Sequence, residues 1–198
     1  MYGESFWRKV LDYIYRHFVE PYRNVYLKLD GKPLVLSFAP VGLVCRPKDP
    51  RFVIRVVATR VDLWKPLSLF GIRADWDLWP DYIVGKPRVE LKIRTDGYVA
   101  IAPRFDDTRM CIAGARRGCW SRLLDPDYSS RIYEEEWRWI LSHLDKVKII
   151  AIYSWNEYHE RSEIEPHIDA TARNGLYPYE ITKTFIQRVK SLCREVDA

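Results

Sequence analysis

Apolar residues recur at three- and four-residue intervals in three stretches of the chain, and this spacing predicts amphipathic helices that bury one face. The first stretch runs from Glu4 to Glu20. The second begins at Ser129 or Ser130, either of which can cap a helix, and it continues to Leu144. The third runs from Tyr179 to Val196. We expect these helices to pack on a sheet.

Four short apolar runs lie between these helices and are typical of buried strands. They are Leu34–Ala39, Phe52–Ala58, the run from the Asp96-Gly97 turn to Pro103, and Val147–Tyr153. Each connection is long enough for a helix or a large loop, which predicts parallel strands with outer helices. Four such strands are half of an eight-stranded barrel. We therefore predict an α/β fold, a partial (β/α)8 TIM barrel, formed by a single domain over residues 1–198.

The length of the chain, 198 residues, is enough for one domain but shorter than the roughly 250 residues of a complete barrel. The sequence has no uninterrupted apolar run of about 18 residues and no charged and apolar leader at its start. On these grounds we expect a soluble, cytoplasmic protein.

Composition adds a bias towards carbohydrate rather than nucleic acid. The net charge is +5 and the pI about 9.0, but the 32 basic and 27 acidic residues are mixed along the chain, and no nucleic-acid motif accompanies them. The chain has eight Trp and thirteen Tyr, which suit sugar faces, although aromatic rings more often fill cores.

The four cysteines show no metal-binding spacing, so we expect buried thiols and no metal site. The Arg- and Glu-rich, Gln- and Asn-poor composition is thermophile-like, which keeps a Cys111–Cys119 bridge open as an alternative.

Residues 61–82 are rich in aromatic side chains and show no periodicity. Such a stretch is either a wall of a substrate site or a cover over an apolar core, and the sequence favours neither. Trp76 and Trp79 are the candidate sugar-binding residues within it.

The densest group of candidate catalytic residues follows the Val147–Tyr153 run, in the stretch SWNEYHERSEIEP that ends at Pro166. Loops after the strands of an α/β barrel carry its chemistry. Glycoside hydrolysis needs one protonated and one ionised carboxyl group, and Glu157 with Glu160 supplies such a pair. A solvated acidic loop is the common alternative. A metal site using His159 and His167 is less favoured, because the H-E-x-x-H pattern is absent.

This stretch resembles the catalytic loop of glycoside hydrolase family 99, the endo-α-mannosidase and mannanase group related to family 71, whose pattern is close to S-[FW]-N-E-[WY]-H-E-G-[ST]-x-I-E-P. One departure is Arg161, where the family usually has Gly. The Asp30–Pro33 turn and the segment PRFDDT, residues 103–108, also resemble the family. The chain matches roughly the second half of that barrel.

The resemblance implies a retaining mechanism on α-mannose-type glycans without a cofactor. It implies that Glu157 assists attack by the sugar 2-hydroxyl and that Glu160 is the acid and base. For the glycan we expect contacts from neighbouring residues: Trp155, Asn156, Tyr158, His159, Glu165 and Asp106. Trp155 and Tyr158 are equally consistent with packing, and Asp106 with capping.

Two other functions stay open at this point: a non-catalytic glycan-binding or assembly subunit, and a polysaccharide-biosynthesis protein with a related barrel. A half-barrel leaves sheet edges and an apolar inner face uncovered. We therefore expect the chain to form a homo-oligomer, or to pair with a complementing half-barrel subunit, along Leu34–Ala39 and Ile149–Tyr153. We expect neither nucleic acid nor membrane as a partner.

Overall fold

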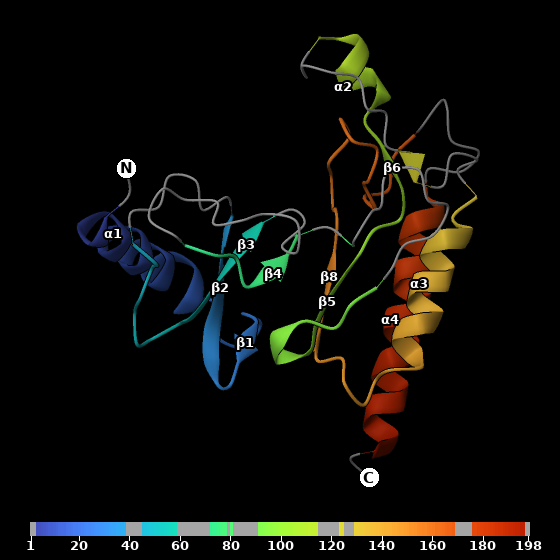
Figure 1. Cartoon of the computed structure of the whole chain (residues 1–198). Coiled ribbons are helices and arrows are strands. Elements are labelled where there is room, and N and C mark those ends of the chain that lie inside the picture. The colour runs from blue at the N-terminus through green and yellow to red at the C-terminus, as the bar shows by residue number, and fades with distance from the viewer. Residues whose placement is uncertain are drawn as a thin grey trace. The chain divides into compact units, whose positions relative to one another are not determined.

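The computed structural model describes residues 3–38, 45–58, 72–78, 80, 91–114, 123–124, 129–168 and 176–196. The chain divides into two units, Met1–Leu78 and Trp79–Ala198 (Figure 1). The single domain expected over residues 1–198 stays a prediction.

The first unit begins with the predicted helix, which is confirmed but changes its winding. Helix α1, Glu4–Ile14, continues directly into a π-helical turn, η1, Tyr15–Val19. A π turn contains an extra residue compared with an α turn, so the buried position shifts along the chain. Val19 is therefore buried, and its neighbour Phe18 is exposed.

The first unit contains a four-stranded sheet in the order β1-β2-β3-β4. Strands β1, Lys28–Leu29, and β2, Lys32–Phe38, form an antiparallel hairpin. Its two-residue turn, Asp30-Gly31, has φ angles of 50° and 75°, the left-handed values that favour Asp-Gly in such hairpins. Strand β3, Val53–Ala58, runs parallel to β2. Both predicted strands are thus confirmed, but Leu36 and Phe38 on β2 are exposed, so that strand is not buried throughout.

Leu11 of α1 and Val19 of η1 form a buried cluster with Val35 of β2 and with Phe52, the residue before β3. A fourth strand, β4, Trp76–Asp77, lies parallel to β3 inside the stretch 61–82 that lacked any periodicity. Two residues are too few for an alternating pattern to be visible in the sequence.

The second unit is built on two parallel strands, β5, Tyr98–Ile101, and β8, Ile149–Ile152, which pair residue by residue from Tyr98 opposite Ile149. A 3₁₀ turn, η4, Thr95–Gly97, leads into β5. Gly97 has a φ of +69°, and a Cβ there would lie 2.6 Å from the Lys146 carbonyl oxygen, so the approach of the two chain segments requires glycine. The predicted Asp96-Gly97 turn and both strands are confirmed.

Helices α3, Arg131–Leu141, and α4, Tyr177–Val196, lie side by side in Figure 1 and pack with the β5–β8 pair. The Trp137 and Phe185 rings stack between the two helices at 5.6 Å. The Ser129 hydroxyl accepts a hydrogen bond from the Arg131 amide (3.2 Å), and α3 ends three residues before the predicted Leu144. The buried core of the unit comprises Val99, Ile101, Tyr133, Trp137, Ile140, Val147, Ile164 and Ile181.

Short elements follow β5 along the chain. Strand β6, Phe105–Asp106, pairs with β7, Leu123–Leu124, in the antiparallel sense, and the one-turn helix α2, Thr108–Ile112, lies between them. The sequence had indicated none of the three elements.

The architecture is mixed α/β and rich in parallel strands. The four predicted strands do not appear as one sheet among the described residues: β2 and β3 belong to one sheet, and β5 and β8 to another. Within the described residues, no helix is long and apolar enough to cross a membrane.

Candidate active site

The ends of β5 and β8 lie at the same edge of the second unit, because the two strands are parallel. Strand β5 leads into residues 102–108, and β8 leads into residues 153–165, here called the glutamate loop. The Tyr153 amide donates to the Ile101 carbonyl (2.9 Å), and the Asp106 amide donates to the Glu160 carbonyl (2.8 Å). Two segments that are far apart in sequence therefore meet at Glu160.

The glutamate loop closes on itself at its base. The Ser154 amide donates to the Ser162 carbonyl (2.8 Å), and the Ile164 amide donates to the Ser154 carbonyl (3.0 Å). The Ser154 hydroxyl also accepts a hydrogen bond from the Glu157 amide (2.8 Å). The Tyr153–Ser154 peptide at the start of the loop is cis. Glu157 and Glu160 lie between these closing contacts: the Glu157 amide bonds within the loop, and the Glu160 carbonyl bonds to Asp106.

The two predicted catalytic carboxylates occupy contrasting environments. Glu160 is only 6% exposed, and its Oε2 accepts a hydrogen bond from the Tyr153 hydroxyl (2.7 Å). The Glu157 side chain is 42% exposed, and its Oε1 lies 3.6 Å from His159 Nδ1. One carboxylate is thus enclosed by protein and the other faces solvent.

A buried ion pair joins the glutamate loop to the segment that follows β5. Arg104 and Glu163 are both almost fully buried, and Arg104 Nη2 donates to Glu163 Oε1 (2.6 Å). Arg104 Nε donates to the Arg161 carbonyl (2.8 Å), so one guanidinium contacts both the main chain and a side chain of the loop. His167 Nε2 lies 3.1 Å from the same Glu163 oxygen. Glu163, within the acidic run of the motif, therefore supports the loop from inside.

Arg161, the residue that departs from the family pattern, adopts a left-handed backbone conformation with a φ of 47°. Glycine enters this region without strain, which explains physically why glycine suits the position. Arg161 keeps the conformation and directs its guanidinium to Asp106, with Nη1 3.5 Å from Oδ2. The Asp106 Oδ1 accepts from the Thr108 amide (3.0 Å). The capping interpretation of Asp106 is thus confirmed, and the residue also lies at the edge occupied by Glu160.

The remaining predicted loop residues form an outer side that faces solvent: Trp155, Asn156, Tyr158 and His159 are all exposed. Glu165 is half-buried and accepts a hydrogen bond from the Tyr158 hydroxyl. This bond to a carboxylate raises the pKa of Tyr158 to about 12. The loop thus has an outer side and an inner side, the inner side consisting of the buried residues Glu160, Ser162, Glu163 and Ile164.

Of the two tryptophans chosen from residues 61–82, the structure describes Trp76. Trp76 is fully buried on β4 in the first unit, with the Arg55 guanidinium 5.6 Å from the centre of its ring. It presents no exposed face there on which a sugar could stack. Trp79 lies outside the described residues.

Glu136 on α3 is a site residue that the sequence did not indicate. It is buried, and its Oε2 accepts a hydrogen bond from the Ala102 amide (3.0 Å), directly before the segment that carries Asp106. Burial raises the pKa of Glu136 well above the ordinary value. Glu136 belongs to the acidic run Glu134–Glu136 near the start of α3, where the helix dipole favours acidic residues. The better signal is its position three residues after Tyr133 and four before Ile140, which puts it on the buried face of α3.

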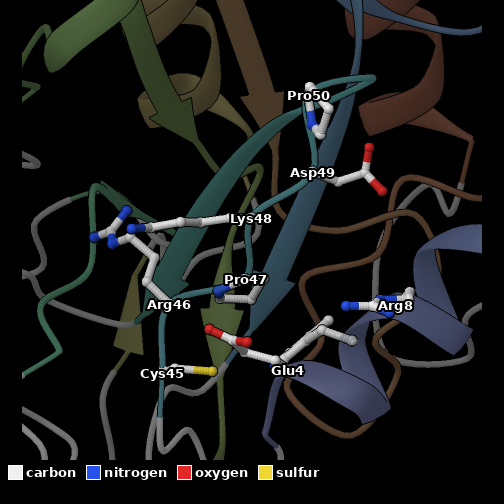
Figure 2. A pocket seen from close by; sticks show the side chains of 9 residues that line it. Glu4, Arg8, Cys45, Arg46, Pro47, Lys48, Asp49 and Pro50 are labelled. Carbon is white, nitrogen blue, oxygen red and sulfur yellow. The ribbon is translucent and has the colours of Figure 1, made fainter.

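Among the described residues, no metal-binding group lies at the glutamates, and one cavity lies in the first unit. No group of three or more His, Cys, Asp or Glu among the described residues could hold a metal ion. A cavity of about 460 Å³ lies in the first unit, where side chains of α1 and of residues 45–50 line it (Figure 2). Cys45 at this cavity is half-buried and Cys193 on α4 is exposed, so the expectation of buried thiols is wrong for both. The side chains of Cys111 and Cys119 lie outside the described residues.

Comparison with solved structures gives the class of the fold. No family model and no curated protein matches the sequence. Two of the solved structures that match are those of glycoside hydrolases, so the chain has a glycoside-hydrolase-like fold.

Within that class, the fold is similar to that of glycoside hydrolase family 99. The endo-alpha-mannosidase of this family from Bacteroides thetaiotaomicron matches with a TM-score of 0.55 and 15% identity, over 93% of this chain and 62% of that one. The enzyme from the same source in complex with Bis-Tris-propane matches with a TM-score of 0.57 and 15% identity, over 95% of this chain and 66% of that one. The present chain therefore spans less than two thirds of these structures, and the likeness concerns the fold.

Proposed function

We propose that this protein is a glycoside hydrolase that acts on α-mannose-type glycans through the carboxylate pair Glu157 and Glu160. The observation that carries this proposal is the contrast between the two groups: Glu160 is enclosed and bonded to Tyr153, whereas the Glu157 side chain is 42% exposed. Carboxyl groups in different environments are what allow one to act as an acid and the other as a base. The likeness to a family 99 endo-alpha-mannosidase supports the choice of substrate.

The proposed reaction retains the anomeric configuration in two steps. In the first step, Glu157 takes the proton of the sugar 2-hydroxyl, and the 2-oxygen of the sugar attacks the anomeric carbon. Glu160 protonates the departing glycosidic oxygen. This gives an anhydro-sugar and a free leaving group. In the second, Glu160 takes a proton from water, the hydroxide adds to the anomeric carbon, and the 2-oxygen recovers its proton from Glu157. These steps use only carboxyl groups, water and the sugar, without a cofactor.

The outer side of the loop is proposed to bind the glycan. Trp155 is about half exposed and offers a flat ring of the kind that covers a sugar face. His159, close to Glu157, is suited to orient that carboxylate or a sugar hydroxyl. The proposed contacts are completed by Asn156, Tyr158, Glu165, Asp106 and Trp79.

We also propose that a partial barrel of this kind associates through β2, either with a second copy or with a complementing half-barrel subunit. Leu36 and Phe38 are exposed on this strand, and apolar surface is stabilised by burial at about 25 cal/mol per Å². Light scattering after size-exclusion chromatography tests this. A monodisperse monomer near 23.6 kDa at micromolar concentration would contradict self-association.

Incubation with aryl α-mannosides and α-mannan oligosaccharides, with proton NMR of the first product, tests the function. We expect turnover and release of the α-anomer before mutarotation. Binding of the oligosaccharides without turnover would instead indicate a glycan-binding or assembly subunit. Absence of both would contradict the proposed substrate class.

A further inference from the structure

The backbone immediately after Glu160 is held in a conformation that non-glycine residues rarely adopt. Arg161 has a φ of 47°. In such a conformation the Cβ crowds the main chain, so a neighbouring group must hold the residue in place. The direction in which Glu160 enters the site depends on this turn, because the two residues share a peptide bond.

Arg104 provides that hold from outside the loop. Its Nε donates to the Arg161 carbonyl oxygen at 2.8 Å, and its Nη2 donates to Glu163 Oε1 at 2.6 Å. A planar guanidinium can serve a carbonyl and a carboxylate in one fixed orientation, which the point charge of a lysine cannot do. Arg104 itself is fixed because it lies in the buried run Tyr98–Phe105 that continues β5.

The carboxylate of Glu163 faces Arg104 and His167 and is closed to solvent. It is 2% exposed, and its second oxygen, Oε2, is buried without a hydrogen-bond partner among the described residues. Its Oε1 faces both Arg104 Nη2 and His167 Nε2. A buried carboxylate with this arrangement serves to anchor the guanidinium rather than to face a substrate.

We propose that Arg104 is the positioning residue for Glu160: by holding the Arg161 carbonyl, it fixes the turn that places the Glu160 carboxylate on Tyr153 and its carbonyl on the Asp106 amide. This deepens the function proposed above and rests on it where activity is concerned. The placement of the turn, however, can be measured without any substrate.

The critical variant is Arg104→Lys, which keeps the positive charge beside Glu163 but cannot donate to both partners in the same geometry. Arg138→Lys is the matched control, since Arg138 is an exposed arginine on α3. Hydrogen exchange followed by NMR reads the turn directly. In Arg104→Lys we expect the Asp106 amide, bonded to the Glu160 carbonyl, to exchange at least about tenfold faster. The Ala102 amide, bonded to Glu136, should keep its rate and serves as the internal control.

Activity gives the second reading. We expect kcat of Arg104→Lys to fall about 10²-fold, as misplacement of a reacting group by about 1 Å does, with KM within about twofold of the wild-type value. In Arg104→Ala, added guanidinium should restore part of kcat, because the ion can occupy the vacated position. A merely structural role would produce neither this split nor the rescue.

The outcomes separate the two proposals. If the wild type shows no turnover but the Asp106 amide exchanges faster in Arg104→Lys, the proposed function is contradicted and the positioning role is supported. An unchanged Asp106 exchange rate in Arg104→Lys overturns the positioning role, whatever the activity. If Arg104→Lys does not fold, Glu163→Gln replaces it. That variant removes the charge that anchors Arg104, and the same acceleration at Asp106 is expected.

Discussion

The inner and outer sides of the glutamate loop differ in burial and in bonding, although the exposed residues of 155–159 and the buried residues of 160–164 follow one another directly in the sequence. Glu160, Ser162, Glu163 and Ile164 are buried. Glu160 and Glu163 bond to the segment that follows β5, and Ser162 and Ile164 bond to Ser154 at the start of the loop. Trp155, Tyr158 and His159 are exposed and make mostly local contacts. The comparison teaches that the acidic motif is not one cluster of functional groups: one side builds the loop, and the other is available to a ligand.

The largest effect on stability is expected on the inner side. Arg104→Met removes one member of a buried ion pair and leaves Glu163 with its charge uncompensated by the guanidinium. We expect the free energy of unfolding to fall by about 3–5 kcal/mol. Urea denaturation measures it, with exposed Glu135→Gln as the control. A decrease in unfolding free energy of less than about 1 kcal/mol would contradict the view that the inner side holds the loop together.

Glu136, below the inner side, should make stability depend on pH. Its pKa in the folded protein is raised by burial, so its stabilising contribution is complete below the ordinary glutamate pKa and is lost as pH rises through the raised value. Each unit of the shift corresponds to about 1.4 kcal/mol. Glu136→Gln stays neutral at all pH values. The unfolding free energy of the wild type minus that of the variant should therefore decrease as the pH is raised from about 4 to about 8. A constant difference would contradict the assignment.

A smaller effect is expected at Arg161, where the two sides meet. Arg161→Gly and Arg161→Ala both remove the contact with Asp106, but only glycine relieves the left-handed φ of 47°. We expect the glycine variant to be the more stable of the two by about 1 kcal/mol, measured by the shift in denaturation midpoint. Equal stabilities would show that the turn is not strained in solution.

The smallest effect on stability is expected on the outer side. Trp155→Ala removes an exposed ring, so the unfolding free energy should change by less than about 0.5 kcal/mol. The KM for an α-mannan oligosaccharide should nevertheless rise, by roughly 5–30-fold if the ring covers a sugar. An unchanged KM together with a lower unfolding free energy would show that Trp155 stabilises the loop and does not bind the glycan.

Sequence periodicity located the strands and helices that are long enough to repeat a pattern. Val147–Tyr153 and Phe52–Ala58 were recognised because apolar runs bounded by polar residues are visible in one dimension. Strand β4 was not, because two residues carry no pattern. The π turn at Tyr15–Val19 was also missed, since its extra residue alters the register without altering composition.

The candidate site could be predicted only where its chemistry is local. Glu157 and Glu160 are three residues apart and belong to one motif. Arg104 and Glu163 are separated by 59 positions, and nothing in the sequence pairs them. The same is true of Glu136 and Ala102, which meet because α3 packs near the end of β5. Trp76 shows the reverse error: an aromatic residue within an irregular stretch was a candidate for sugar binding, and it is buried on a short strand.

The central claim is that the enclosed Glu160 and the exposed Glu157 form a catalytic pair, and single-residue amide variants test it most directly. The measurement is kcat on an activated α-mannoside for Glu160→Gln, Glu157→Gln and the control Glu135→Gln, each with its thermal unfolding curve. We predict that both loop variants lose about two to four orders of magnitude while their unfolding midpoints stay near that of the wild type, and that the control keeps full activity. Full turnover by Glu160→Gln, on a wild type that is active, would contradict the account.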